Sequence, residues 1–168
     1  MPNVRHATID DADAIARIYN EGIADRTATF ETEPRTSRMI AAWFDGMHPV
    51  VVVEAGGRVV AFASTSAYRE RECYRRIGDF SVYIGRDDRA HGYGSLAMGG
   101  LIDAARSSGF TKLVSRVFPD NLASLALLRQ LGFREVGIYM RHGQLDGIWK
   151  DAVIVEKILD TDNVGLPG

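Results

Sequence analysis

Cysteine is nearly absent from the 168-residue sequence, and its single copy, Cys73, excludes both an intrachain disulfide and a cysteine-based metal site. The four histidines are scattered without the spacing that places two of them on one helical face, so we expect no bound metal. No apolar run is long enough to span a bilayer and no signal peptide is recognisable, which indicates a cytoplasmic protein. A large excess of charge of one sign is also lacking. The net charge of −2 predicts neither a nucleic-acid partner nor a membrane partner.

The sequence has the composition of a soluble globular protein, with 46% hydrophobic and 25% charged residues. Its length suits one domain with a substantial core. We expect this single domain over residues 1–160 and a loose tail over residues 161–168, which include Gly165, Pro167 and Gly168.

Short β-rich runs alternate with longer runs that have a helical period. The pair Gly56-Gly57 between two β-rich runs is typical of a hairpin. Residues 22–35 show no clear period and are expected to form a loop. The pattern predicts an α/β chain with a mixed sheet, with strands over residues 4–7, 50–54, 58–64, 80–84, 112–117, 133–142 and 148–158 and helices that begin near residues 8, 36, 92 and 121.

The most informative stretch is the charged turn between the strand at residues 80–84 and the helix that follows. It contains Arg89, Gly92 and Gly94. The unpaired N–H groups and the positive dipole end of the helix make this turn a candidate site for a phosphate or pyrophosphate. We expect both glycines to be needed because a side chain at either position would block the approaching anion.

Several phosphate-binding loops share this arrangement. A nucleotide triphosphatase would need the string G-x-x-x-x-G-K-[ST], which the sequence lacks. A dinucleotide-binding fold would match Gly92, Gly94 and Ala97, but it also needs a carboxylate at the end of the next strand, and residues 112–117 offer none. An ordinary glycine-rich turn is another alternative. We favour the remaining one, since RAHGYG at residues 89–94 resembles the R/Q-x-x-G-x-G/A signature of the GNAT acyltransferase superfamily.

The resemblance to this superfamily extends over nearly the whole chain. Asn121-x-x-Ser124 and LGF at residues 131–133 follow the turn in the expected order. Four further phrases are similar to the branch of phosphinothricin, methionine sulfoximine and arsinothricin N-acetyltransferases: IYNE at residues 18–21, FETEP at 30–34, DFSVYI at 79–84 and GIWKD at 147–151.

The resemblance implies an α/β (α+β) fold with a mixed, mostly antiparallel sheet, a central parallel pair of strands that splay apart, and helices on both faces. The pantetheine arm of acetyl-coenzyme A is expected to lie in that gap like an added strand. The implied coenzyme-binding residues are Val82, Tyr83 and Ile84 along the strand, Arg89, Ala90, His91, Gly92, Tyr93, Gly94 and Ser95 around the pyrophosphate, and Asn121 and Ser124 toward the thiol end.

In this superfamily a neutral amine attacks a thioester, so a base must take a proton from the acceptor. Asp79 stands where this branch has a glutamate in that role, and its shorter side chain would need a relaying water. An unperturbed aspartate, with a pKa of about 3.9, is a weak base, so burial would have to raise its pKa. The alternative for Asp79 is a strand-edge carboxylate paired with Arg75 or Arg76. Leu128 replaces the histidine or tyrosine that protonates the leaving thiolate in relatives. Leu145 replaces a lysine that this branch usually has in its last hairpin.

The resemblance also suggests how the acceptor is recognised. Arg71 and Tyr74 match an R-x-x-Y phrase beside the acceptor pocket of this branch, where a guanidinium can bind a carboxylate or phosphinate through two hydrogen bonds. A solvated arginine cluster is the alternative. Phe30 and Tyr83 are expected to supply apolar walls. The resemblance thus implies a homodimeric N-acetyltransferase that acts on a small amino-acid-like amine, with detoxification or resistance as its setting. Transfer to a protein or peptide amine, and coenzyme binding without turnover, remain alternatives.

Overall fold

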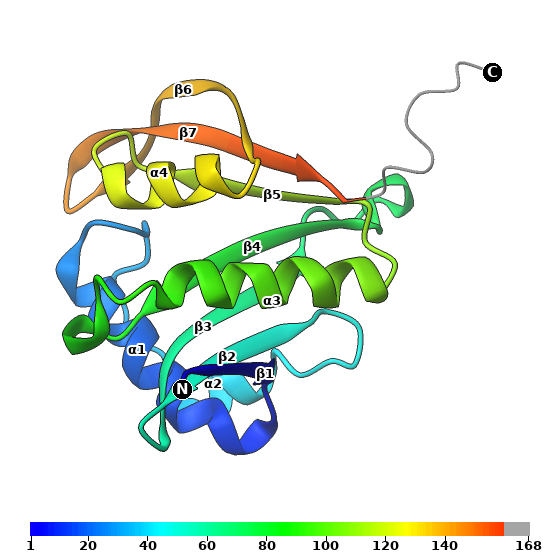
Figure 1. The fold of residues 1–168 in the computed structure, drawn as a ribbon. Coiled ribbons are helices and arrows are strands. Elements are labelled where there is room, and N and C mark those ends of the chain that lie inside the picture. The colour runs from blue at the N-terminus through cyan, green and yellow to red at the C-terminus, as the bar shows by residue number, and fades with distance from the viewer. Residues whose placement is uncertain (160–168) are drawn as a thin grey trace.

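The computed structural model describes residues 1–159, and the tail expected over residues 161–168 lies outside the described residues. Within residues 1–159 a seven-stranded sheet has the order β1-β2-β3-β4-β5-β7-β6 (Figure 1). Its neighbouring strands are antiparallel except for β4 and β5, which confirms the expected mixed, mostly antiparallel architecture. The strands are β1 Asn3–His6, β2 Val50–Ala55, β3 Arg58–Ala67, β4 Ile77–Ile84, β5 Lys112–Val117, β6 Arg134–Leu145 and β7 Ile148–Ile158.

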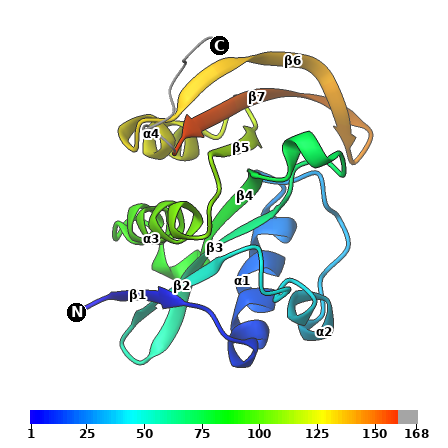
Figure 2. The ribbon, with the colours of Figure 1, turned by 90° about the vertical axis from the view of Figure 1, so that its right-hand side faces the viewer.

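Helices cover both faces of the sheet, as predicted (Figure 2). On one face, α1 and α2 enclose a core that includes the fully buried Ile15 and Phe62. On the other face, α3 and α4 pack over a core that includes Met98 and Leu101. None of the described helices combines the length and apolarity needed to cross a membrane. The helices are α1 Ala12–Asp25, α2 Ser37–Ala41, α3 Tyr93–Ser107 and α4 Leu122–Gln130, with single 3-10 turns at Ile9–Asp11, Glu72–Tyr74 and Arg86–Asp88.

Local sequence signals explain several of these boundaries. The hydroxyl of Thr36 accepts a hydrogen bond from the N–H of Met39 at 3.2 Å and so caps α2. Gly56 and Gly57 have φ angles of +60° and +76°, which suits the tight turn between β2 and β3. The expected hairpin is therefore confirmed.

The prediction of a loop over residues 22–35 is partly wrong, because α1 continues through Gly22 to Asp25. Gly22 is buried inside the helix, where an added Cβ would lie 2.7 Å from the ring of Tyr83. This glycine allows a strand side chain to approach the helix closely and does not end the helix. The helix ends at Arg26, whose φ of +58° is left-handed.

The parallel strands β4 and β5 pair over a short distance. Residues 77–79 are in register with residues 112–114, and no pairing continues beyond Asp79 and Val114. The hydroxyl of Ser115 then donates a hydrogen bond of 2.8 Å to the carbonyl oxygen of Phe80. Beyond this contact the strands diverge (Figure 1), which confirms the expected splayed pair.

Candidate active site

Asp79 lies where β4 and β5 part, and the pleat of β4 determines the direction of its side chain. Alternate strand residues face opposite sides of a sheet. Phe80 packs into the core beneath α3 and α4, whereas the Tyr83 ring lies 5.0 Å from the ring of Tyr19 on α1. Asp79, Ser81 and Tyr83 therefore face the side that α1 and α2 cover.

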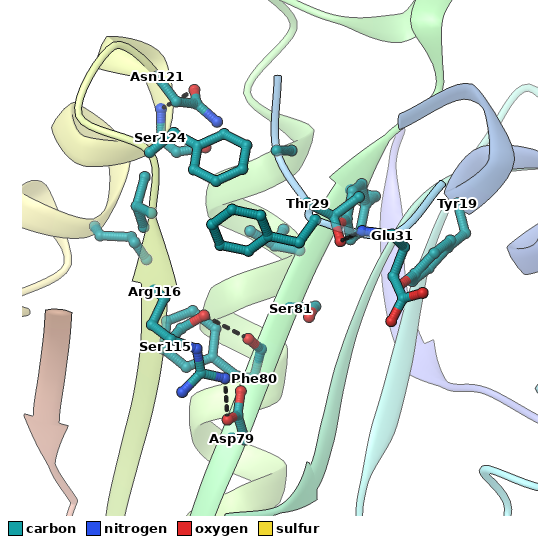
Figure 3. Close-up of a pocket in the computed structure, with 17 residues that line it drawn as sticks. Tyr19, Thr29, Glu31, Asp79, Phe80, Ser81, Ser115, Arg116, Asn121 and Ser124 are labelled. Carbon is teal, nitrogen blue, oxygen red and sulfur yellow. Dashed lines mark hydrogen bonds and ion pairs between the residues drawn. The ribbon is translucent and has the colours of Figure 1, made fainter. Parts of the chain in front are cut away.

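A cavity of about 260 Å³ lies at this opening. Figure 3 shows Asp79 at one end of it, Asn121 and Ser124 of α4 at the other end, and Thr29 and Glu31 of the loop after α1 along its side. The cavity brings together the following residues predicted from the sequence: Phe30, Asp79, Val82, Tyr83, Asn121 and Ser124.

Within the cavity Asp79 forms an ion pair that the sequence did not indicate. Nη2 of Arg116 on β5 lies 2.5 Å from Oδ2 of Asp79 (Figure 3). The alternative pairing of Asp79 with Arg75 or Arg76 is not found, because Arg75 pairs with Glu72 and Nε of Arg76 donates to the carbonyl of Gly109. The register of β4 against β5 decides the partner, and a parallel register across a crossover has no local sequence signal.

Two opposing effects act on the Asp79 carboxyl. Burial raises its pKa above the usual value, while the hydrogen bond and positive charge of Arg116 lower it. The net pKa shift is upward. The Asp79 carboxylate is thus a stronger base than an exposed aspartate, as the proposed role requires.

The turn before α3 has the geometry of an anion site. Ala90 and Gly92 have φ angles of +66° and +80°, and among the described residues no side chain caps the first turn of the helix. The N–H groups that open α3 are therefore available to a ligand. His91 stacks on Tyr93 with ring centroids 5.5 Å apart, and Ser95 is exposed in the first turn.

The two glycines of this turn have different structural roles. No atom lies within 4 Å of a Cβ added at Gly92, and this residue is needed for its positive φ. The expectation that a side chain at Gly94 would block an anion is wrong. A Cβ there would point inward and meet Ile84 and Leu127 at 3.0 and 3.1 Å, so Gly94 allows close packing of α3 against the neighbouring elements.

Asp25 is a residue of this region that the sequence reasoning missed. Its carboxylate accepts hydrogen bonds from Arg86 at 2.8 Å and from Arg89 at 2.7 Å. The guanidinium of Arg89, followed by that of Arg86, holds the pKa of the Asp25 carboxyl below its usual value. The end of α1 thus orients two cations next to the start of α3.

At the far end of the cavity, Asn121 caps α4 by accepting a hydrogen bond from the N–H of Ser124 at 3.3 Å. Leu128 is buried and lines the cavity, and its aliphatic side chain carries no exchangeable proton. Leu145, the other departure from the pattern of relatives, is also buried.

The structure does not bring Arg71 and Tyr74 to the cavity of Asp79. They line a separate hollow of about 170 Å³ beside the turn between β3 and β4. A third hollow of about 440 Å³ shares Tyr19 and Ser81 with the Asp79 cavity and His48 and Ala67 with the Arg71 hollow. The 440 Å³ hollow therefore lies between the other two and adjoins both of them.

Comparison with known proteins agrees with this geometry. Residues 15–133 match the acetyltransferase (GNAT) family. The chain belongs to this family. The GNAT chain is 32% identical to the L-methionine sulfoximine/L-methionine sulfone acetyltransferase of Pseudomonas aeruginosa, over 94% of this chain and 95% of that protein. It is 31% identical to the phosphinothricin N-acetyltransferase of Alcaligenes faecalis, over 98% and 86% of the two chains.

Solved structures of GNAT proteins share the fold. The yncA structure from Salmonella typhimurium, solved with its cofactor acetyl-CoA, has a TM-score of 0.92 and 27% identity and covers 100% of this chain and 99% of its own. The ribosomal-protein-alanine N-acetyltransferase from Brucella melitensis has a TM-score of 0.88 and 32% identity, and the match covers 93% of this chain and 99% of that chain. These matches confirm the family and the N-acetyltransferase class expected from the sequence.

Proposed function

We propose that this chain transfers the acetyl group of acetyl-coenzyme A to the amine of a small, amino-acid-like acceptor. The observation that carries the proposal is the partly buried carboxylate of Asp79 at the point where β4 and β5 part, facing a cavity. Relatives named for methionine sulfone and phosphinothricin support this acceptor class. A cytoplasmic location and a role in resistance remain predictions.

The residues present fit the coenzyme. The uncapped N–H groups of α3 and the Arg89 guanidinium suit its pyrophosphate, and the backbone of residues 82–84 faces the gap where pantetheine would extend the sheet. Asn121 and Ser124 line the cavity toward the thiol end. When bound, acetyl-coenzyme A supplies an activated acyl group as a thioester.

Asp79 acts on the proton of the acceptor. A free amino acid carries an ammonium group at neutral pH, and Asp79 takes one proton from it, directly or through a water. The neutral nitrogen then forms a C–N bond to the thioester carbonyl carbon as the C–S bond breaks. The nitrogen loses its second proton, the thiolate leaves as a thiol by gaining a proton, and one proton passes to solvent in the net reaction. Backbone N–H groups in the gap donate to the carbonyl oxygen as it gains negative charge.

Because Leu128 carries no acidic group, this position of α4 supplies no proton to the departing thiolate. Because a thiol has a pKa of about 8.5, its thiolate is a tolerable leaving group near neutral pH. Phe30 and Tyr83 line the cavity together with Asp79, which supports the proposal that their rings form its apolar walls around a small acceptor.

Transfer to a peptide amine is a second candidate function. The three adjoining hollows would accommodate an extended chain from Asp79 to Arg71 and Tyr74. The Brucella melitensis relative, named for a ribosomal protein, also favours this candidate.

We also propose that the protein is a homodimer, with the exposed hairpin of β6 and β7 as the contact surface. Large apolar side chains are exposed along these two strands, and β6 is an edge of the sheet. Such a surface is typical of a protein interface. Its exposed members are Val136, Ile138, Tyr139, Met140, Ile148 and Trp149.

The test of the activity is a screen that measures free thiol released from acetyl-coenzyme A in the presence of methionine sulfone, phosphinothricin and a panel of peptides. We expect turnover with the free amino acids and its loss in Asp79→Asn, with coenzyme affinity by calorimetry unchanged. Unchanged turnover in this variant would remove Asp79 from the mechanism. Coenzyme binding without thiol release by any amine would instead support a binding module.

A further inference from the structure

We propose that Arg116 binds the α-carboxylate of the acceptor while Asp79 holds its amine, so that the enzyme is selective for free α-amino acids. This inference rests on the proposed function and adds a specificity-determining residue to it. The recognition element is the Asp79–Arg116 ion pair in the cavity wall (Figure 3).

The contacts of this ion pair leave room for a second partner on each side. Arg116 uses Nη2 alone, and its Nε and Nη1 have no hydrogen-bond partner among the described residues. Asp79 uses Oδ2 alone, and its Oδ1 likewise has no described partner. A ligand can therefore bind both residues without breaking the bond between them.

The charges of the cavity wall match a zwitterion. Of the described residues that line this cavity, Arg116 alone carries a positive charge, and Asp79 and Glu31 carry negative charges. Glu31 already forms an ion pair of 2.8 Å with Arg35, which leaves Asp79 and Arg116 as the pair of opposite charges for a ligand. An α-amino acid bears its ammonium and carboxylate groups on the same carbon, so it can present both groups to adjacent partners. The ammonium would pair with Asp79. The carboxylate would bind the second N–H of Nη2 of Arg116 together with Nη1 or Nε, in the two-bond arrangement that a guanidinium favours.

The same arrangement disfavours other amines. An amide or ester of the amino acid has no carboxylate, and the N-terminal residue of a peptide has its carboxyl group consumed in a peptide bond. Each would leave the remaining N–H groups of Arg116 without a second carboxylate to bind. The proposal thus favours the free amino acid over the peptide acceptor of the second candidate function.

Arg71 is the competing residue, because the R-x-x-Y phrase assigns carboxylate binding to it. Arg71 lines a different hollow from Asp79, whereas the guanidinium of Arg116 contacts the Asp79 carboxylate. A group bound at Arg116 is therefore next to the proposed base, as the α-carboxylate of a reacting amino acid must be.

The experiment compares acid and amide acceptors in the full-length protein. The ratio of kcat/KM for methionine sulfone to that for its α-amide is measured by thiol release, and the same pairing is made for phosphinothricin. The variants are Arg116→Gln, Arg116→Lys, Arg71→Gln, and Arg134→Gln as a matched control whose strand arginine pairs with Glu156 away from the cavity. Calorimetry with each acceptor in the presence of coenzyme A gives affinities independently of turnover.

We expect the wild type to prefer the acid by about 10- to 100-fold, the usual effect of hydrogen bonds to a charged group. Arg116→Gln should bring the ratio close to one, and Arg116→Lys should give an intermediate ratio. Arg71→Gln and Arg134→Gln should retain the preference. A change in the pKa of Asp79 would alter turnover of acid and amide alike, so the ratio reports on the carboxylate alone.

The proposal is overturned if Arg116→Gln and Arg116→Lys keep the wild-type ratio, if Arg71→Gln alone abolishes it, or if the wild type shows no preference by turnover and calorimetry. Failure of the proposed function has a different signature. There, calorimetry would show an acid preference that depends on Arg116, but no acceptor would release thiol.

Discussion

Asp25 at the end of α1 accepts a hydrogen bond of 2.7 Å from Arg89 in the turn before α3. The two residues are 64 positions apart in the chain, so this contact orients a cation of the proposed pyrophosphate site from a distant element. A buried or oriented guanidinium has fewer rotamers to lose when an anion binds.

We expect Arg89→Gln to weaken acetyl-coenzyme A binding about tenfold, or about 1.4 kcal/mol, since a charged hydrogen bond to the pyrophosphate is lost. Calorimetry at two salt concentrations measures this, and the variant should also show a weaker salt dependence than the wild type. Arg129→Gln, which removes an exposed arginine paired with Glu135, serves as the control and should bind normally. Equal affinities of Arg89→Gln and wild type would exclude Arg89 from the site.

The activity should depend on pH through Asp79. The carboxylate is the active form, so kcat/KM falls as the pH drops through its pKa, which burial has raised. Arg116 stabilises the carboxylate and lowers that pKa, so its removal raises it. We predict that Arg116→Gln moves the acid limb of the kcat/KM profile to higher pH, whatever its effect on the height of the profile. An acid limb that stays in place or moves to lower pH would contradict this.

Gly22 and Gly99 form a matched pair of helical glycines with opposite expected responses to alanine. Gly99 has nothing within 4 Å of an added Cβ, so Gly99→Ala should stabilise α3 by about 0.5–1 kcal/mol. In Gly22→Ala the new methyl group would lie 2.7 Å from the Tyr83 ring, so we expect net destabilisation and lower activity as that ring moves. Urea unfolding measures both, and stabilisation by Gly22→Ala would show that Tyr83 moves freely.

The proposed dimer predicts a concentration-dependent mass. Met140 is 71% exposed on the outer strand β6, so Met140→Lys should place a charge in the contact surface and yield monomers. Light scattering after gel filtration distinguishes the two states. Leu122→Lys, at an exposed apolar residue on α4, is the control and should leave the wild-type mass unchanged. A monomeric wild type would exclude the dimer.

Features governed by neighbouring residues were predictable from the sequence. The Gly56-Gly57 hairpin, the Thr36 cap and the glycine-rich turn before α3 each depend on a few adjacent residues with known backbone preferences. The resemblance added the splay of β4 and β5 and the position of Asp79 beside it.

Features governed by distant contacts were not predictable in the same way. Gly22 has the appearance of a helix end, yet the Tyr83 ring 61 positions later explains it. The register of the parallel strands β4 and β5 brings Arg116 next to Asp79. The path of the turn after β3 places Arg71 in a different hollow from Asp79. In each case a tertiary contact outweighed the local pattern.

The Ser115 hydroxyl has a consequence for any ligand that extends the sheet. Because it already donates to the carbonyl oxygen of Phe80, that oxygen has one of its two lone pairs engaged, and an incoming chain would find fully unpaired main-chain groups only farther along β4. We therefore expect the Ser115 hydroxyl to shift a guest molecule toward the open end of β4, and with it the depth at which an acyl group would stop relative to Asp79.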